Sequence, residues 1–197
     1  ARIVLHGLPD DAKAESACDA MINAGAPEVK YVGADVSEPE NIDQMMAEIT
    51  AWCGVDILVN NAGIQHPAAI ADYPRKYWDA ILAVNLSACF HTMQAVLPTM
   101  AERGYGRVIN IASVQGLIGS VNKGPYVAAK HGLVGLSKVA ALEYATAGTK
   151  SAGGVTVNCI CPGWTETELI LPQIEIRQQQ IGGSRDEAIA DLLKEKQ

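Results

Sequence analysis

Strand, helix and strand follow one another in residues 107–163, RVINIASVQGLIGSVNKGPYVAAKHGLVGLSKVAALEYATAGTKSAGGVTVNCICPG. The first run, Arg107–Ala112, and the last run, Val155–Ile160, are short and rich in Val and Ile, as expected of buried strands. The segment Tyr126–Thr146 between them has the apolar spacing of a helix. Two strands joined by a helix predict a parallel pair, because a parallel connection must return to the first end of the sheet.

The same alternation continues toward the N-terminus. A helix is expected to begin at the capping box Ser37–Glu40 and to run to about Trp52. The other expected elements are strands at residues 1–6, 29–34 and 56–60 and helices at residues 11–24 and 76–103. Apolar strands that alternate with helices predict an α/β fold, a doubly wound parallel sheet with helices on both faces, in one domain that spans residues 1–197.

The composition is that of an ordinary globular chain of 197 residues, 49% hydrophobic and 19% charged. It excludes a disordered chain and a coiled coil. The net charge of −7 argues against a nucleic-acid partner. We expect no membrane span, because no apolar run approaches the roughly 18 residues that a span requires. The five cysteines are scattered through apolar segments, which predicts reduced thiols in the cytoplasm rather than a disulfide framework or a metal site.

Polar residues and tight turns directly follow the predicted strands. They are Asp35-Val36, Asn61-Ala62-Gly63, Ser113 and Pro162-Gly163. Ligands of doubly wound sheets bind outside the carboxyl ends of the strands, so these residues are expected to share one site. The Asn61-Ala62-Gly63 turn lets a flat ligand approach the backbone. The Asp35 carboxylate is suited either to accept a hydrogen bond from an amino group, such as that of adenine, or to cap the next helix.

Ser113, Tyr126 and Lys130 form the sharpest chemical pattern. Tyr126 and Lys130 are four residues apart in a helical segment and therefore share one face. A phenol has a pKa of about 10, and a neighbouring ammonium lowers it by favouring the phenolate. Ser113, at the end of a strand, is suited to donate a hydrogen bond to a carbonyl or alkoxide oxygen. The three residues predict a site that moves a proton on and off a carbinol oxygen.

With these motifs in this order, the chain resembles a short-chain dehydrogenase/reductase from Ala1 to about Gln173. The motifs that carry the resemblance are Asp35-Val36, Asn60-Asn61-Ala62-Gly63, Asn85 in Val-Asn-Leu, Ser113, Tyr126-Val-Ala-Ala-Lys130, and Pro162-Gly163 with Thr167 beyond it. The resemblance implies a Rossmann-like fold, a nicotinamide cofactor and a homotetramer.

The resemblance also assigns roles to these residues. It makes Tyr126 the general acid/base, and Lys130 the residue that lowers its pKa and binds the nicotinamide ribose. Ser113 would position the substrate oxygen, and Asn85 would support a water relay from Lys130. The cofactor would lie against Asp35, Val36, Asn61, Ala62 and Gly63 at its adenosine half and against Pro162, Gly163, Thr165 and Thr167 at its nicotinamide end.

Two departures from the family pattern concern the ends of the sequence. The family's glycine-rich phosphate loop precedes the strand with which this sequence begins, and its last strand follows the end of the sequence. We expect the full protein to contain both. Near His6-Gly7-Leu8 this chain has no Lys or Arg to meet the 2′-phosphate of NADP, which favours NAD.

Four further positions resemble the members of the family that interconvert (R)-3-hydroxybutyrate and acetoacetate, namely Gln65, Lys123, Trp164 and Gln173. The Lys123 cation would pair with the carboxylate of a small hydroxy acid, and Trp164 would limit its chain length. Gln115 departs from these members, which commonly have His there, since an amide cannot become cationic. The helical residues 165–197 would form a lid over the substrate.

The sequence leaves other functions open. One alternative is a different short-chain dehydrogenase, such as a 3-oxoacyl-thioester reductase or a sugar or polyol dehydrogenase. Another is a non-catalytic scaffold with a decayed cofactor site. Lys123 together with Trp164 favours a small free acid over a long acyl chain. The intact Ser113, Tyr126 and Lys130 favour an enzyme over a scaffold.

Overall fold

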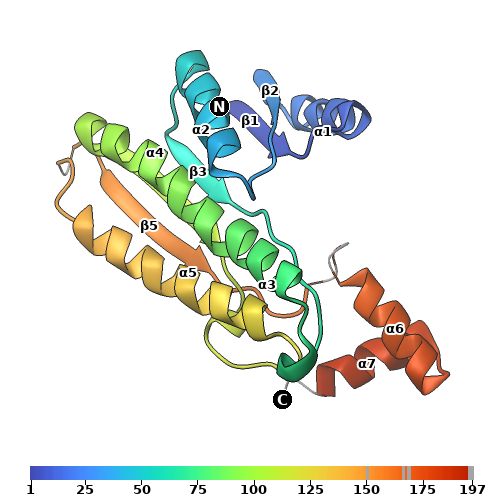
Figure 1. Cartoon of the computed structure of the whole chain (residues 1–197). Coiled ribbons are helices and arrows are strands. Elements are labelled where there is room, and N and C mark those ends of the chain that lie inside the picture. Colours follow the sequence, from blue (N-terminus) through green and yellow to red (C-terminus); the bar gives the residue numbers. More distant parts are fainter. Residues whose placement is uncertain (150, 166, 168–169, 195–197) are drawn as a thin grey trace.

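The computed structural model describes residues 1–149, 151–165, 167 and 170–194. Strands and helices alternate along it (Figure 1). The strands are β1 (Arg2–Gly7), β2 (Glu28–Gly33), β3 (Ile57–Asn60), β4 (Tyr105–Ile111) and β5 (Gly154–Ile160). The α-helices are α1 (Asp11–Asn23), α2 (Pro39–Trp52), α3 (Arg75–Leu82), α4 (Ala88–Arg103), α5 (Gly124–Glu143), α6 (Leu171–Ile181) and α7 (Arg185–Lys194). Short helical segments are η1 (Ile70–Asp72), η2 (Ala83–Ser87) and η3 (Val114–Gly116).

All strand pairs are parallel, which confirms the predicted α/β class. The strands nevertheless form two sheets, β1-β2 and β3-β4-β5, where the sequence predicted one. The register pairs Asn60 with Asn110 and Ile111 with Ile160, so the carboxyl ends of β3, β4 and β5 lie level. Apolar strand patterns identify strands but carry no information about which edges pair, and this is why the division was not predicted.

The main core lies between β3-β4-β5 and the helices α4 and α5, with α2 against α4. Val96 and Met100 of α4 pack with Val108 of β4, and all three are at most 1% exposed. Gly106 permits this approach, because a Cβ atom there would lie 2.4 Å from the Met100 sulfur. Gly106 therefore sets how closely α4 packs on β4.

The predicted helix 76–103 contains a π-helical segment, η2, between α3 and α4. Asn85 lies at its centre and is fully buried. Widened turns of this kind often mark functional sites, because they redirect a side chain out of the regular helical row. By length and composition, the helical segment Arg75–Arg103 is apolar enough to cross a membrane, but half of its most apolar 18-residue stretch is buried inside the protein. It packs as a core helix.

The predicted capping box at Ser37 is wrong. The N-cap of α2 is Glu38, which makes no capping hydrogen bond with its side chain. The Ser37 hydroxyl instead donates to Asp35 Oδ1 at 2.7 Å, and the Ser37 backbone N–H donates to the same oxygen at 2.9 Å. Asp35 therefore closes a turn after β2. Its carboxylate binds the Ser37 hydroxyl, which the sequence pattern predicted to cap α2.

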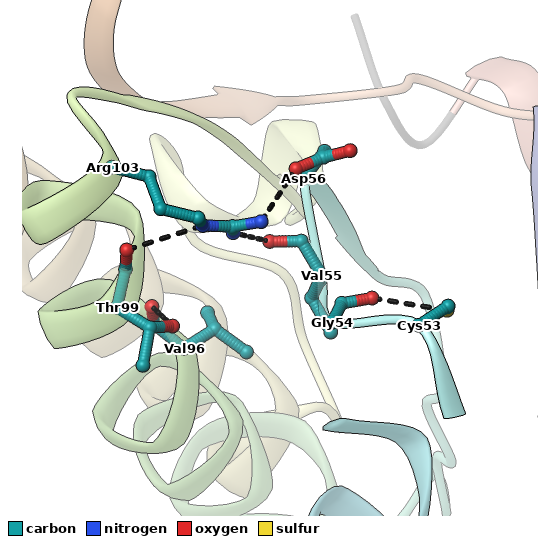
Figure 2. Close-up of polar contacts among 7 residues, drawn as sticks. All are labelled: Cys53, Gly54, Val55, Asp56, Val96, Thr99 and Arg103. Carbon is teal, nitrogen blue, oxygen red and sulfur yellow. Dashed lines mark hydrogen bonds and ion pairs between the residues drawn. The ribbon is translucent and has the colours of Figure 1, made fainter. Parts of the chain in front are cut away.

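The amino end of the three-stranded sheet is held by Arg103 (Figure 2). Its guanidinium donates to Asp56 Oδ1 at 2.8 Å, to Thr99 O at 3.2 Å and to Val55 O. Gly104, in the left-handed conformation with φ of 71°, ends α4 beside it. The last turn of α4 is thus connected to the segment that enters β3, at the end of the sheet remote from the strands' carboxyl termini.

Replacing Arg103 with Ala should lower stability without changing activity. The lost bonds are partly exposed, so we expect a cost of about 0.5–1.5 kcal/mol and a fall in Tm of about 1–6 °C. Lys13→Ala is the matched control, because Lys13 is 84% exposed and lies 3.8 Å from Asp10. Thermal unfolding of both variants checks this. Equal Tm values for Arg103→Ala and Lys13→Ala would contradict the assigned role.

Candidate active site

A cavity of about 300 Å³ opens at the carboxyl ends of β3, β4 and β5. This volume suits a small ligand or one end of a larger one. Residues from the strand ends, from η3, from the start of α5 and from the segment after β5 line it. Of the predicted site residues, those in the lining are Asn61, Gly63, Gln65, Ser113, Gln115, Lys123, Tyr126, Lys130, Pro162, Gly163, Trp164, Thr165 and Thr167.

Tyr126 and Lys130 lie on the first turns of α5, both turned inward. Their residues are 8% and 4% exposed. Lys130 Nζ donates to the backbone oxygen of Ile111 at 2.7 Å and lies 5.7 Å from the centroid of the Tyr126 ring. Ile111 is the last residue of β4. The four-residue spacing thus places a phenol and an ammonium together at the end of this strand.

Burial dominates the electrostatics of this pair. Desolvation raises the pKa of the Tyr126 phenol above its usual range, and a side-chain hydrogen bond with Ser113 lowers it in part. Desolvation likewise lowers the pKa of the Lys130 ammonium. The sequence led us to expect a lowered Tyr126 pKa, and in this structure the direction is the reverse. Spacing reveals which groups meet but not how far they are removed from water.

Ser113 is held by the short helix η3. Its Oγ accepts a hydrogen bond from the Gln115 backbone N–H at 3.1 Å. The Val114 N–H donates to Pro162 O at 2.9 Å, which connects this turn to the segment after β5. Gln115 is 6% exposed and lines the cavity. The hydroxyl of Ser113 and the amide of Gln115 are therefore presented from one turn.

Asn85 does not line the cavity but holds its wall. Its Oδ1 accepts from Ile64 N at 2.8 Å, and its Nδ2 donates to Ile64 O at 2.8 Å. A Cβ atom on Gly63 would lie 3.4 Å from Asn85 Oδ1 and 3.9 Å from Lys130 Nζ. Asn85 thus fixes the turn at residues 61–64 against Lys130. The water relay expected of Asn85 stays a prediction.

Two loops that pair beside the cavity place Lys123. Ala68 forms a parallel bridge with Lys123, and the Ala68 N–H donates to Asn122 O at 2.9 Å. Asn122 has a φ of 62°, in the left-handed region that asparagine tolerates better than most residues. Lys123 is then the N-cap residue of α5. This pairing was not predicted, because neither loop has a strand pattern.

Other predicted site residues lie outside the cavity lining. Asp35 and Val36 follow β2, and hydrogen bonds from Ser37 lower the pKa of the Asp35 carboxyl group, which is ionised at neutral pH. Ala62 lies in the exposed turn after β3. Gln173 lies on α6, and among the described residues its buried Nε2 has no hydrogen-bond partner.

The sequence analysis missed the apolar part of the cavity wall, formed by Ile111, Ala112, Val114 and Ile170. The first three adjoin Ser113, so their nearness to a predicted site residue was the available signal. Ile170 lies just before α6. Glu166 and residues 168–169 and 195–197, which belong to the predicted lid, lie outside the described residues. The described helices α6 and α7 pack against each other.

Comparison with known proteins identifies the family. The short chain dehydrogenase profile matches residues 1–176. The chain belongs to the short-chain dehydrogenase family. It is similar to the D-beta-hydroxybutyrate dehydrogenase of Cupriavidus necator, with 48% identity over all of this chain and 74% of that protein. The enzyme of the same name from Rhizobium meliloti is 42% identical over 98% of this chain and 73% of that protein.

A solved structure also matches. The gluconate 5-dehydrogenase of Burkholderia cenocepacia, in complex with NADP and tartrate, superposes with a TM-score of 0.78 and 31% identity. The match covers 90% of this chain and 68% of that one. This protein is thus an oxidoreductase with the Rossmann-like fold of its family, whose members use nicotinamide cofactors.

The described residues fit such a cofactor at its nicotinamide end. Gly63 keeps the turn after β3 free of a side chain next to Lys130. An ammonium has three donor hydrogens, and Ile111 O takes one of those of Lys130, which leaves capacity for ribose hydroxyls. At the end of β2, the ionised Asp35 can accept a hydrogen bond from an amino group.

Replacing Tyr126 with Phe should remove the hydroxyl that the sequence analysis predicts to transfer the proton, and should preserve ring packing. We expect kcat to fall about 10²- to 10⁴-fold, with cofactor affinity changed by no more than a few-fold. Because the raised pKa keeps the phenol protonated, the oxidation rate of the wild type should rise with pH as the phenolate forms, and the reduction rate should fall. Steady-state rates against pH, with cofactor titration, check both. A Tyr126→Phe variant that kept more than about a tenth of wild-type kcat would contradict the assignment.

Proposed function

We propose that this protein is an NAD-dependent oxidoreductase that interconverts (R)-3-hydroxybutyrate and acetoacetate. The observation that carries the proposal is that one cavity combines Ser113, Tyr126 and Lys130 with the cation-bearing residue Lys123. The first three suit proton transfer at a carbinol oxygen, and the fourth suits a substrate carboxylate. Similarity to two D-beta-hydroxybutyrate dehydrogenases over nearly the whole chain supports it.

In oxidation, Tyr126 as the phenolate accepts the hydroxyl proton of the substrate. Ser113 donates a hydrogen bond to the same oxygen and holds it near the phenol. The Lys130 ammonium favours the phenolate that the raised pKa of Tyr126 otherwise opposes. The bound nicotinamide cofactor supplies the hydride acceptor. In reduction Tyr126 begins as the neutral phenol and returns the proton.

The carboxylate end of the substrate lies toward Lys123 in this proposal. Gln65 and Gln115 share the cavity wall with Lys123 and add amide donors for carboxylate oxygens. Gln115 is neutral, so in this proposal Lys123 provides the positive charge that pairs with the substrate carboxylate. Trp164 also lines the cavity and would limit the chain length of the acid. Gln173, with its buried Nε2 atom lacking a partner among the described residues, supplies a further donor when α6 approaches as part of a lid formed by residues 165–197.

NAD is proposed as the cofactor because residues 6–10, at and after the end of β1, include no Lys or Arg that would meet a 2′-phosphate. His6 and Gly7 end the strand, and Leu8, Pro9 and Asp10 follow. Asp10 already caps α1 by accepting from Lys13 N at 3.1 Å. The Lys13 ammonium, on the first turn of α1, already lies 3.8 Å from the Asp10 carboxylate. The NADP bound to the gluconate 5-dehydrogenase belongs to that protein.

We also propose that the protein acts in the cytoplasm as a homotetramer of single-domain subunits. Phe90 of α4 and Leu142 of α5 are 43% and 78% exposed, and large apolar side chains on helix surfaces favour self-association. The free cysteines suit a reducing compartment. Gel filtration with light scattering tests the assembly.

The test of the reaction is an assay of the purified full-length protein with (R)-3-hydroxybutyrate. We expect turnover with NAD, at a kcat/KM at least about tenfold above that with NADP. Gluconate and a 3-oxoacyl thioester are the comparison substrates, because they represent the other activities considered. Faster turnover of either one, or preference for NADP, would overturn the corresponding part of the proposal.

Replacing Lys123 with Ala should separate a free acid from an uncharged substrate. The loss of a hydrogen bond to a charged group should raise KM for 3-hydroxybutyrate roughly 10- to 150-fold, with a smaller fall in kcat. The methyl ester, which lacks the charge, should be affected far less. Lys138→Ala, an exposed change on α5, controls for net charge. Equal losses for acid and ester would show that Lys123 does not recognise the carboxylate.

A further inference from the structure

A chain of buried and half-buried polar side chains crosses the protein directly beneath the cavity. Thr92 Oγ1 lies 2.8 Å from Asn60 Oδ1, and Asn60 Nδ2 donates to Asn110 Oδ1 at 2.8 Å. Asn110 Nδ2 donates to Ser137 Oγ at 2.7 Å, and Cys159 Sγ donates to the same oxygen at 3.1 Å. The chain thus joins α4, β3, β4, α5 and β5 through side chains alone.

Ser137 is the member of this chain that belongs to the helix of Tyr126 and Lys130. It is 3% exposed, and its hydroxyl is fully used. It donates to Leu133 O at 2.7 Å and accepts from both Asn110 and Cys159. A hydroxyl has one donor hydrogen and two acceptor lone pairs, so Ser137 forms every hydrogen bond available to it.

Two levels of hydrogen bonding connect α5 to β4. Asn110 bonds to Ser137, and the next residue of the strand, Ile111, accepts from Lys130. Ser137 follows Lys130 by seven residues, two helical turns, and so lies on the same face of α5. Two hydrogen bonds therefore connect α5 to successive residues of β4, one through Ser137 and one through Lys130.

The hydrogen bonds of Lys130 and Ser137 constrain the position of the α5 backbone to different degrees. The lysine reaches the strand through four methylene groups and can follow its carbonyl if the helix shifts. The serine hydroxyl lies one bond from its Cβ, so its bond to Asn110 constrains the helix backbone. Leu133 and Ala140 pack between helix and sheet without directional preference. Ser137 is therefore the group that sets the register of α5 on the sheet.

We propose that Ser137 is a positioning residue for proton transfer, because it sets the register of α5 that brings Lys130 and Tyr126 to the end of β4 beside Ser113. The inference rests on the proposed roles of Tyr126 and Lys130. It extends them to a residue outside the cavity lining that touches neither substrate nor cofactor.

The test is Ser137→Ala in the full-length protein. We expect kcat to fall about 3- to 20-fold, because small displacements of catalytic groups cost up to about 10²-fold. The pKa seen in the pH profile of kcat should rise by about 0.5–1, because the Tyr126 ring moves with the helix while the Lys130 ammonium stays on the Ile111 carbonyl, and a more distant ammonium favours the phenolate less. The KM values for alcohol and cofactor should change less than about twofold.

Two matched variants separate positioning from general destabilisation. Ser137→Thr keeps the hydroxyl oxygen that accepts from Asn110 Nδ2, and should restore the wild-type pH profile. Val96→Ala removes buried volume from α4 in the main core, where Val96 is 1% exposed, and should lower Tm while leaving the profile unchanged. A shifted profile in Val96→Ala, or no rescue by Ser137→Thr, would overturn the proposal.

An unchanged pH profile in Ser137→Ala would also overturn it. If that variant does not fold, Asn110→Ala decides the question, because it removes the donor of the same hydrogen bond from the side of β4 and leaves Ser137 bonded to Leu133 and Cys159. It should shift the profile in the same direction, and no shift would contradict the inference. Wild-type protein that does not oxidise 3-hydroxybutyrate would disprove the proposed substrate instead, and the profiles are then measured with whichever alcohol the enzyme oxidises.

Discussion

The buried ammonium of Lys130 is the constraint on which the site depends. A cation that is 4% exposed must find polar partners, or its desolvation would oppose folding. The last carbonyl of β4 provides one such partner, at 2.7 Å. Burial lowers the pKa of Lys130, and Cys89, Cys159 and Cys161 raise it only when they are ionised to thiolates. Burial raises the pKa of Cys89 to about 11, so that thiol is neutral at pH 7.

The three-stranded sheet changes character along its length. At its amino end, Arg103 ties α4 to the entry of β3 in partly exposed positions (Figure 2). The middle is apolar, with Met100 and Val108 fully buried. Nearer the carboxyl ends, Asn60, Asn110 and Ser137 form a hydrogen-bonded layer. A satisfied polar layer of this kind fixes the relative positions of strands and helices more tightly than apolar contacts do, and the proton-transfer residues lie directly above it.

The sequence predicted most elements and misjudged features that depend on neighbours. Strand and helix bounds lie within three residues of expectation, with the largest difference at the end of α5, predicted at Thr146 and found at Glu143. The Ser37 capping box failed because Asp35 takes the serine hydroxyl. The raised pKa of Tyr126 escaped prediction because desolvation depends on everything that packs around the ring. The pairing of Ala68 with Lys123 joins two loops whose residues have no periodicity to read.

By itself, the sequence determined that strands alternate with helices, and that Ser113 follows a strand while Tyr126 and Lys130 share a helix face. Hydrophobic spacing and side-chain chemistry are local properties, and a one-dimensional pattern carries them in full. Only the tertiary structure decided that the strands form two sheets, that Asn85 holds the turn at Ile64, and that Ser137 meets Asn110 beneath the cavity. These features depend on which distant surfaces exclude water together, and on which buried polar groups must then find partners in one another.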